Sequence, residues 1–192
     1  MTEGQYIERA NAHKAASEYQ ASIIEFRNAL RLNPDNAMAR RMLAELYILM
    51  EDGVAGEEQL RWLSRSEPLG EQGVRQLGRA LLLQGRFEDL LSEVQTESGF
   101  SPAGRAEILA LRARAHVFSR QTAEARRLTD EAKRLSPGAL PVLEAQIVLA
   151  QLCCRLARHP GVDRANGDTD AAALAVVEVK AHHPLVFGID QD

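Results

Sequence analysis

The sequence predicts an all-α fold, a right-handed superhelical solenoid built from helix–turn–helix repeats. The first observation is composition: only 5% of the 192 residues are aromatic, while alanine, leucine, arginine and glutamate, all good helix formers, dominate. The second is a period, since four prolines follow one another at intervals of 34, 34 and 35 residues. A unit of that length is too short for a domain and fits one pair of helices. The prolines are Pro34, Pro68, Pro102 and Pro137.

A third observation is a small residue at one place in each unit: Ala10, Ala44, Gly78 and Ala113. A small side chain there lets two helix backbones approach closely. Other residues recur around it at three- and four-residue steps, which places them on one helix face. This inward-facing set comprises Tyr6, Phe26, Ala29, Leu43, Tyr47, Leu60, Leu63, Val74, Leu77, Leu81, Leu90, Val94, Leu109, His116, Ala125 and Ala132.

The elements follow from this register. Full units are expected at about residues 3–36, 37–70, 71–104 and 105–139, with a partial fifth at 140–157. Turns inside the units are expected near residues 17–19, 51–53, 84–87 and 119–122, where glycines suit a helix C-terminus and Ser or Thr an N-cap. At the first joint, Pro34 ends one helix and Asp35 or Asn36 can cap the next.

The C-terminal residues 158–192 are predicted to be an irregular or poorly ordered tail. Residues 158–170 hold a proline, two glycines and four Asp or Asn residues, which favour a loop. One short helix is compatible with residues 171–182. A truncation or a frame change after about residue 157 is a hypothesis that this break in the pattern raises.

Several stretches resemble the tetratricopeptide repeat (TPR): FRNALRLNP (26–34), LAELY (43–47) and LGRALLLQGRF (77–87). The chain also resembles, over about residues 4–150, the N-terminal repeats of the TPR lipoproteins of the PEP-CTERM/exosortase system. The marks are SIIEFRNAL with NPDNAMAR, then GRALLLQGRFEDLL. This resemblance implies a bacterial protein that takes part in exopolysaccharide export or envelope assembly.

Charge and motifs argue against most other classes. A formal charge of −4 gives no general attraction to nucleic acid or to anionic membranes, and the longest apolar run, 147–154, is too short to span a bilayer. The first fourteen residues have no apolar signal core. We therefore expect a cytoplasmic protein as encoded, with the periplasm or cell envelope as the alternative if an upstream signal is missing.

No catalytic or metal site and no cofactor are expected. His13 and His116 occupy the slot where the repeat usually has tyrosine, so packing is the simpler interpretation. The soft ligands lack zinc-site spacing, and the adjacent cysteines are interpreted as fillers of the fifth helix pair. Those ligands are Cys153, Cys154, His159, His182 and His183. The chain has no phosphate-binding glycine loop and no nucleophile motif, so we expect no enzyme.

The candidate site is the concave groove, lined by the first helix of each unit. Its four arginines could form a basic stripe with apolar residues at its edge, suited to an extended protein or peptide partner with acidic groups and an apolar anchor. The alternative is that the arginines are solvated and pair with neighbours such as Glu71 and Glu45. The groove residues are Asn11, Arg41, Glu45, Ile48, Arg75, Arg79, Leu82, Arg114 and Phe118.

The function predicted is a non-catalytic scaffold for protein–protein interaction. Chaperone-binding TPR domains hold a C-terminal carboxylate in a clamp of Lys, Asn and Arg, but only Asn11 matches it; the other places hold Ile7, Met42, Gln72 and Gln76. Two alternatives stay open: the repeat portion of a larger transferase whose catalytic domain is absent, or a truncated remnant. The sequence does not determine the oligomeric state.

Overall fold

The computed structural model describes the backbone of residues 1–158 and the side chains of residues 1–154. These residues form nine α-helices and no strand. The helices are α1 (Glu3–Ala15), α2 (Tyr19–Leu32), α3 (Ala37–Leu49), α4 (Gly53–Leu63), α5 (Gly70–Leu83), α6 (Phe87–Glu93), α7 (Pro102–Phe118), α8 (Thr122–Leu135) and α9 (Leu140–Arg158).

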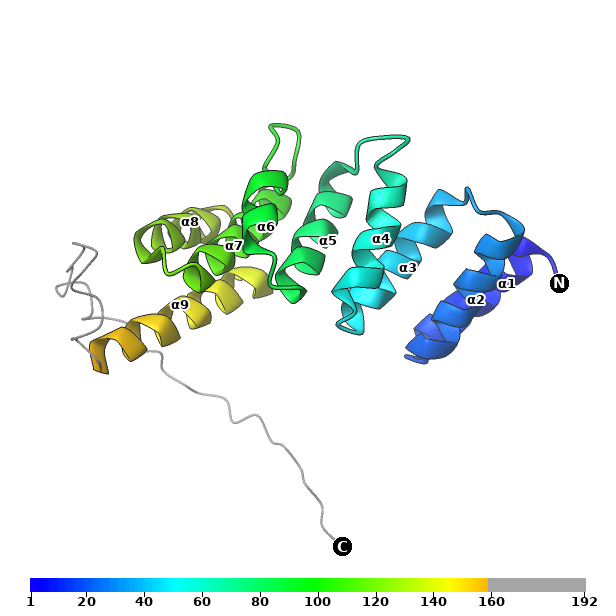
Figure 1. Cartoon of the computed structure of the whole chain (residues 1–192), viewed down its shortest axis with the longest axis horizontal. Helices are drawn as coiled ribbons and strands as arrows, with labels where there is room; N and C mark the ends of the chain where they lie inside the picture. The colour runs from blue at the N-terminus through cyan, green and yellow to red at the C-terminus, as the bar shows by residue number, and fades with distance from the viewer. Residues whose placement is uncertain (159–192) are drawn as a thin grey trace, which may run out of the picture. The chain divides into compact units, whose positions relative to one another are not determined.

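The chain divides into two units, Met1–Leu152 and Cys153–Asp192, and the helices α1 to α8 belong wholly to the first. In the first unit the helices follow one another as antiparallel pairs, each packed on the next, which is the predicted all-α solenoid. Figure 1 shows the first three pairs with their internal turns along one edge and the loops that join successive pairs along the opposite edge.

In each of the four pairs, the same type of turn connects the first helix to the second. One residue has a left-handed backbone, with φ of 60° to 70°, and these residues lie 34, 34 and 35 positions apart: Ser17, Glu51, Gly85 and Arg120. The next N–H donates to a carbonyl five residues back, at 2.8 to 3.0 Å, which is the long bond of a Schellman motif. The accepting carbonyls belong to His13, Tyr47, Leu81 and His116. The predicted turns are therefore confirmed, and the sequence period is also a period of backbone hydrogen bonds.

The small-residue slot is buried in every unit, as predicted. Ala10, Ala44 and Ala113 are fully buried, and a β-carbon at Gly78 would lie only 3.0 Å from Leu111 Cδ1. A larger residue there would push neighbouring helices apart. Most of the inward-facing set is also buried; Tyr6, Tyr47, Val74 and His116 are only partly so.

Gly53 differs from the expectation that turn glycines end helices. It begins α4, directly after the N-cap Asp52, whose side chain accepts a hydrogen bond from the Ala55 N–H at 3.0 Å. A β-carbon at Gly53 would lie 2.6 Å from the carbonyl oxygen of Ala80. Glycine is required here because the backbones of two neighbouring helix pairs come into close contact. Its role is not to end a helix.

The joints place their prolines differently. Pro34 precedes the helix that Asn36 caps through the Ala39 N–H, at 2.8 Å, so the predicted cap is confirmed. Pro102 is instead the first residue of α7, after the N-cap Ser101, a position that suits its fixed φ. The division predicted between residues 104 and 105 therefore falls inside α7.

The second helix of the third pair is short, since α6 has seven residues against 11 to 14 in the other second helices. Arg112 of α7 reaches its end and donates to the carbonyls of Leu91 and Val94, at 2.7 and 2.9 Å. Arg112 stands where the second and third units have Leu43 and Leu77. Burial lowers its pKa, and the two carbonyls accept hydrogen bonds from its guanidinium. One guanidinium thus closes the end of the short helix.

The last predicted elements are described only in part. α9 occupies the place expected for the partial fifth unit, while residues 159–192, with the helix considered at 171–182, lie outside the described residues. Up to Arg158, no helix combines the length and the apolarity that a bilayer span needs.

Candidate binding face

Ion pairs join the first helices of successive pairs at three joints, and we call the surface that carries these pairs the first-helix face. Each basic residue meets a carboxylate 28 to 32 positions later, about one repeat on. The pairs are Lys14–Glu45 between α1 and α3, Arg75–Glu107 and Arg79–Glu107 between α5 and α7, and Arg114–Glu144 between α7 and α9.

The densest of these contacts is at the joint between α5 and α7. Arg75 Nη1 lies 2.7 Å from Glu107 Oε2, and Arg79 Nη2 lies 2.5 Å from Glu107 Oε1. Glu107 is only 6% exposed, whereas the side chain of Arg79 is 48% exposed. Two guanidinium groups therefore share one buried carboxylate, so these three side chains carry a formal charge of +1, and the Glu71 carboxylate also interacts electrostatically with Arg75.

Hydrogen bonding in this cluster is incomplete. Glu107 Oε1 is in ion-pair contact with Arg79 but accepts no well-oriented hydrogen bond, and the buried Nε of Arg75 has no acceptor among the described residues. Buried polar groups are normally satisfied, so such sites call for a reason. Arg114 Nε, whose arginine pairs with Glu144, is buried and unmatched in the same way, so this feature does not by itself distinguish the Arg75–Glu107 site.

The remaining predicted arginines are each matched by one carboxylate. Arg41 Nη2 lies 2.6 Å from Oε1 of Glu67, which belongs to the loop before α5. Both side chains also line a depression of about 250 Å³ at the joint between α4 and α5. Arg114 Nη1 lies 2.9 Å from Glu144 Oε2. Formal charge is therefore balanced at Arg41 and Arg114.

Glu71 and Glu45, the partners considered in the sequence, bond elsewhere. Glu71 accepts the N–H and the hydroxyl of Ser101 at 2.6 and 2.8 Å, which closes the start of α7. Those two bonds, with a smaller electrostatic contribution from Arg75, lower the pKa of Glu71. Glu45 accepts from Lys14 at 2.8 Å. Arg75, Arg79 and Arg114 do pair, but with carboxylates of the next repeat, whereas Arg41 pairs within its own repeat.

The apolar groove residues differ in their surroundings. Ile48 and Leu82 are partly buried against the core, and a β-carbon at Gly56 would lie 2.8 Å from Ile48 Cγ1. Phe118 is about half exposed and stacks on Phe87, with 4.9 Å between ring centroids and 8° between planes. Asn11 is exposed on α1. Arg75 and Arg79 therefore meet at one carboxylate, whereas Ile48 and Leu82 pack against the core and Phe118 stacks on Phe87.

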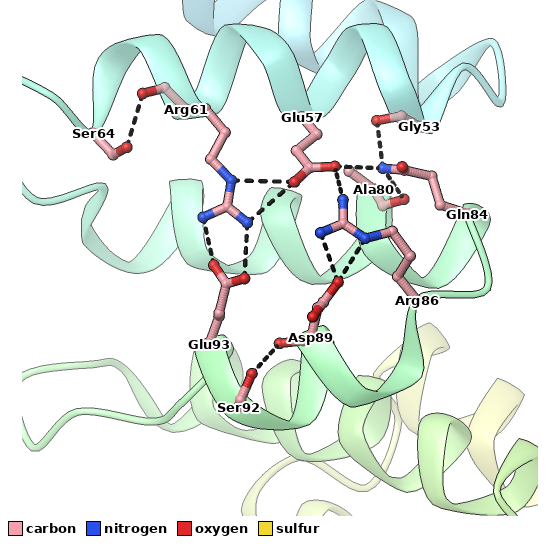
Figure 2. Close-up of polar contacts among 10 residues, drawn as sticks. All are labelled: Gly53, Glu57, Arg61, Ser64, Ala80, Gln84, Arg86, Asp89, Ser92 and Glu93. Carbon is pink, nitrogen blue, oxygen red and sulfur yellow. Dashed lines mark hydrogen bonds and ion pairs between the residues drawn. The ribbon is translucent and has the colours of Figure 1, made fainter.

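A second polar network joins the second helices α4 and α6 (Figure 2). Arg61 binds Glu93 with two nitrogens and donates from Nε to Glu57 Oε1 at 3.1 Å. Glu57 Oε2 accepts from Gln84 and Arg86 at 2.7 and 2.6 Å. Burial raises the pKa of Glu57, but these hydrogen bonds outweigh burial and lower it below its ordinary value. Each of these groups has a hydrogen-bond or ion-pair partner within the network, so the network holds neighbouring helix pairs together.

The two histidines at the position where the repeat usually has tyrosine each bond to a residue across the turn that follows. His13 Nδ1 lies 2.6 Å from Glu18 Oε2, and His116 Nδ1 lies 2.5 Å from Gln121 Oε1. Glu18 and Gln121 are the N-cap residues of α2 and α8. Within the described part of the chain, no group of three or more His, Cys, Asp or Glu residues could hold a metal ion. Cys153 is partly buried and Cys154 exposed.

Sequence reasoning missed Lys14, Glu67, Glu107 and Glu144. The predicted set held mainly basic and apolar positions, so these partners fell outside it. A usable signal was present, since Glu107 and Glu144 each lie about one repeat length after a basic partner, and first helices of consecutive repeats are neighbours.

The fold matches a solved structure. The crystal structure of a thermophilic TPR protein from Thermus thermophilus aligns with a TM-score of 0.60 and 20% identity, over 82% of this chain and 84% of that one. The likeness establishes that this chain has the fold of a tetratricopeptide-repeat protein. No family model and no curated protein matches the sequence.

Proposed function

We propose that this protein is a non-catalytic interaction scaffold whose first-helix face binds a segment of a partner protein that carries a carboxylate. The observation that supports this most is the sharing of one carboxylate, Glu107, by Arg75 and Arg79. Repeat solenoids offer extended surfaces of this kind for binding other proteins.

A partner carboxylate would approach Arg79 from its exposed side. Arg79 faces Glu107 with one nitrogen of its planar fork, and about half of its side chain is open to solvent. A guanidinium has five N–H donors, so it can bind a second carboxylate while keeping the first. At Arg41 and Arg114 charge is already balanced. The third repeat is therefore the proposed centre of recognition.

The process that we propose is assembly of a bacterial exopolysaccharide or PEP-CTERM envelope apparatus, which rests on the sequence resemblance alone. Neighbouring genes for polysaccharide export or exosortase components would favour it. A transferase fragment in frame beside the gene would favour the alternative in which these repeats are part of an enzyme. A remnant without function predicts no selective ligand.

The direct test is selection of binders from a phage-displayed library of random linear peptides with the full chain as bait. We expect enrichment of peptides that carry Asp or Glu beside an apolar residue. Binding of those peptides should weaken about tenfold or more in the Arg75→Gln/Arg79→Gln variant.

Arg127→Gln is the matched control, because Arg127 is exposed on α8 and pairs with Glu124 and Glu131. It removes a paired arginine from a second helix and should leave peptide binding unchanged. Equal binding by all three proteins, each checked for folding by circular dichroism, would reject recognition at Arg75 and Arg79.

A further inference from the structure

Exposed apolar side chains gather on the edge where the helix pairs make their internal turns. The last residues of α3, α5 and α7 are Leu49, Leu83 and Phe118, spaced 34 and 35 residues apart. We call these residues, with Met50 and Val54 beside the second turn, the turn edge. Their exposed fractions are 53%, 45%, 53%, 39% and 66%, respectively.

Neighbouring pairs place these residues next to one another. The starts of α2, α4 and α6 lie beside the ends of α3, α5 and α7. Phe87 stacks on Phe118, and a β-carbon at Gly53, beside Val54, would lie 3.0 Å from Leu83 Cβ. At the first joint, Tyr19 and Met50 line one shallow depression. The same juxtaposition of elements thus recurs at three joints, and we call the exposed apolar residues that lie at these joints the strip.

The charges beside this strip are unevenly distributed. Glu51 and Asp52 are exposed at the second turn, and Glu18 at the first. Arg120 is exposed at the fourth turn, close in sequence to Phe118. Arg86 is exposed at the third turn, so the N-terminal part of the strip is bordered by carboxylates and its C-terminal part by two guanidinium groups.

We infer that the turn edge docks an amphipathic helix of a partner protein, with basic residues toward Glu51 and Asp52. Packed helices lie about 8–10 Å apart, and residues seven apart in a helix are separated by about 10.5 Å. One apolar side chain per seven residues can therefore meet one helix pair after another. A helix also satisfies its own backbone, which matters because the described residues offer no strand edge for an extended segment to pair with.

The test uses two model peptides, an amphipathic helix of leucine and lysine and the same pattern with glutamate in place of lysine. Fluorescence anisotropy with the full chain measures their dissociation constants. We expect the lysine peptide to bind about tenfold more tightly than the glutamate peptide, and to lose about tenfold in affinity in Leu83→Ser/Phe118→Ser. Ile24→Ser removes an equally exposed apolar residue from α2 and should change nothing.

Other occupants give different results. Self-association of the wild-type chain that Leu83→Ser/Phe118→Ser abolishes would mean that a second copy occupies the strip and would overturn the inference. Binding to anionic lipid vesicles with the same dependence would also overturn it. If that variant fails to fold, Leu49→Ser/Val54→Ser serves in its place. Equal affinity for all variants, or for both peptides, rejects the inference.

Discussion

Arg79 Nη2 lies 2.5 Å from Glu107 Oε1, so an exposed guanidinium on α5 is held by a buried carboxylate on α7. This contact joins the third and fourth helix pairs and also fixes where Arg79 can meet a ligand. Stability and ligand binding therefore depend on the same side chains. The charge of Glu107 favours stability but competes with an acidic ligand for the two arginines.

Replacing Glu107 with glutamine separates these two roles. Glu107→Gln keeps the shape but removes the charge, so it should lower the free energy of unfolding by about 1–2 kcal/mol. It should also tighten binding of acidic peptides several-fold, because both guanidinium groups then need a carboxylate. Urea denaturation and peptide titration measure the two effects. Weaker peptide binding in a folded variant would contradict the proposed role of Arg75 and Arg79.

The left-handed turn residues predict a stabilising change. Arg120 adopts φ of 60° at the place where the third turn has Gly85. A side chain in this conformation costs about 1 kcal/mol or more, so Arg120→Gly should raise the free energy of unfolding by about 1 kcal/mol, and Gly85→Ala should lower it by a similar amount. Thermal unfolding checks both signs. A destabilised Arg120→Gly would mean that its side chain supports the turn.

Gly53 predicts a destabilising change with an internal control. Gly53→Ala places a methyl group 2.6 Å from the backbone oxygen of Ala80, which cannot move aside without shifting a helix. We expect a loss of about 1–3 kcal/mol. Gly4→Ala adds the same methyl group where no described atom lies within 4 Å and should be neutral or slightly stabilising. Equal effects of the two changes on the melting temperature would contradict the close contact.

The Glu57 network predicts an acid-dependent loss of stability. The pKa of Glu57 is lowered in the folded chain, so its contribution is present above the unfolded pKa, near 4.5, and is lost as the pH falls through the folded value. Glu57→Gln should therefore destabilise the chain at neutral pH, with a difference from wild type that shrinks below about pH 4.5. Urea midpoints at several pH values test this. If the stability difference between Glu57→Gln and wild type does not change with pH, the charge of Glu57 does not contribute to it.

The repeat period was readable because it is carried by local features: the small-residue slot, the turn position and the cap. The partners in the ion pairs are harder to predict from the sequence. Arg75 had a carboxylate four residues away at Glu71, but that group closes α7 through Ser101, and Glu107 takes its place across the joint. Which of two acids an arginine reaches depends on backbone spacing between repeats, which composition and periodicity do not fix.

The short α6 was hidden for a related reason. Its apolar slots, Leu90 and Val94, match those of a full helix and are both buried. The helix nevertheless ends at Glu93, and Arg112 from the next pair binds its last carbonyls. A tertiary contact there replaces local helix continuation, and a pattern of apolar positions cannot distinguish the two.

The most direct test of the proposed binding face is hydrogen–deuterium exchange of the full chain with and without a selected acidic peptide. The first helices α3, α5 and α7 should exchange more slowly in the complex, with the largest effect in α5 around Arg75 and Arg79. Slower exchange confined to α4, α6 and α8, while the peptide is bound, would contradict binding on the first-helix face.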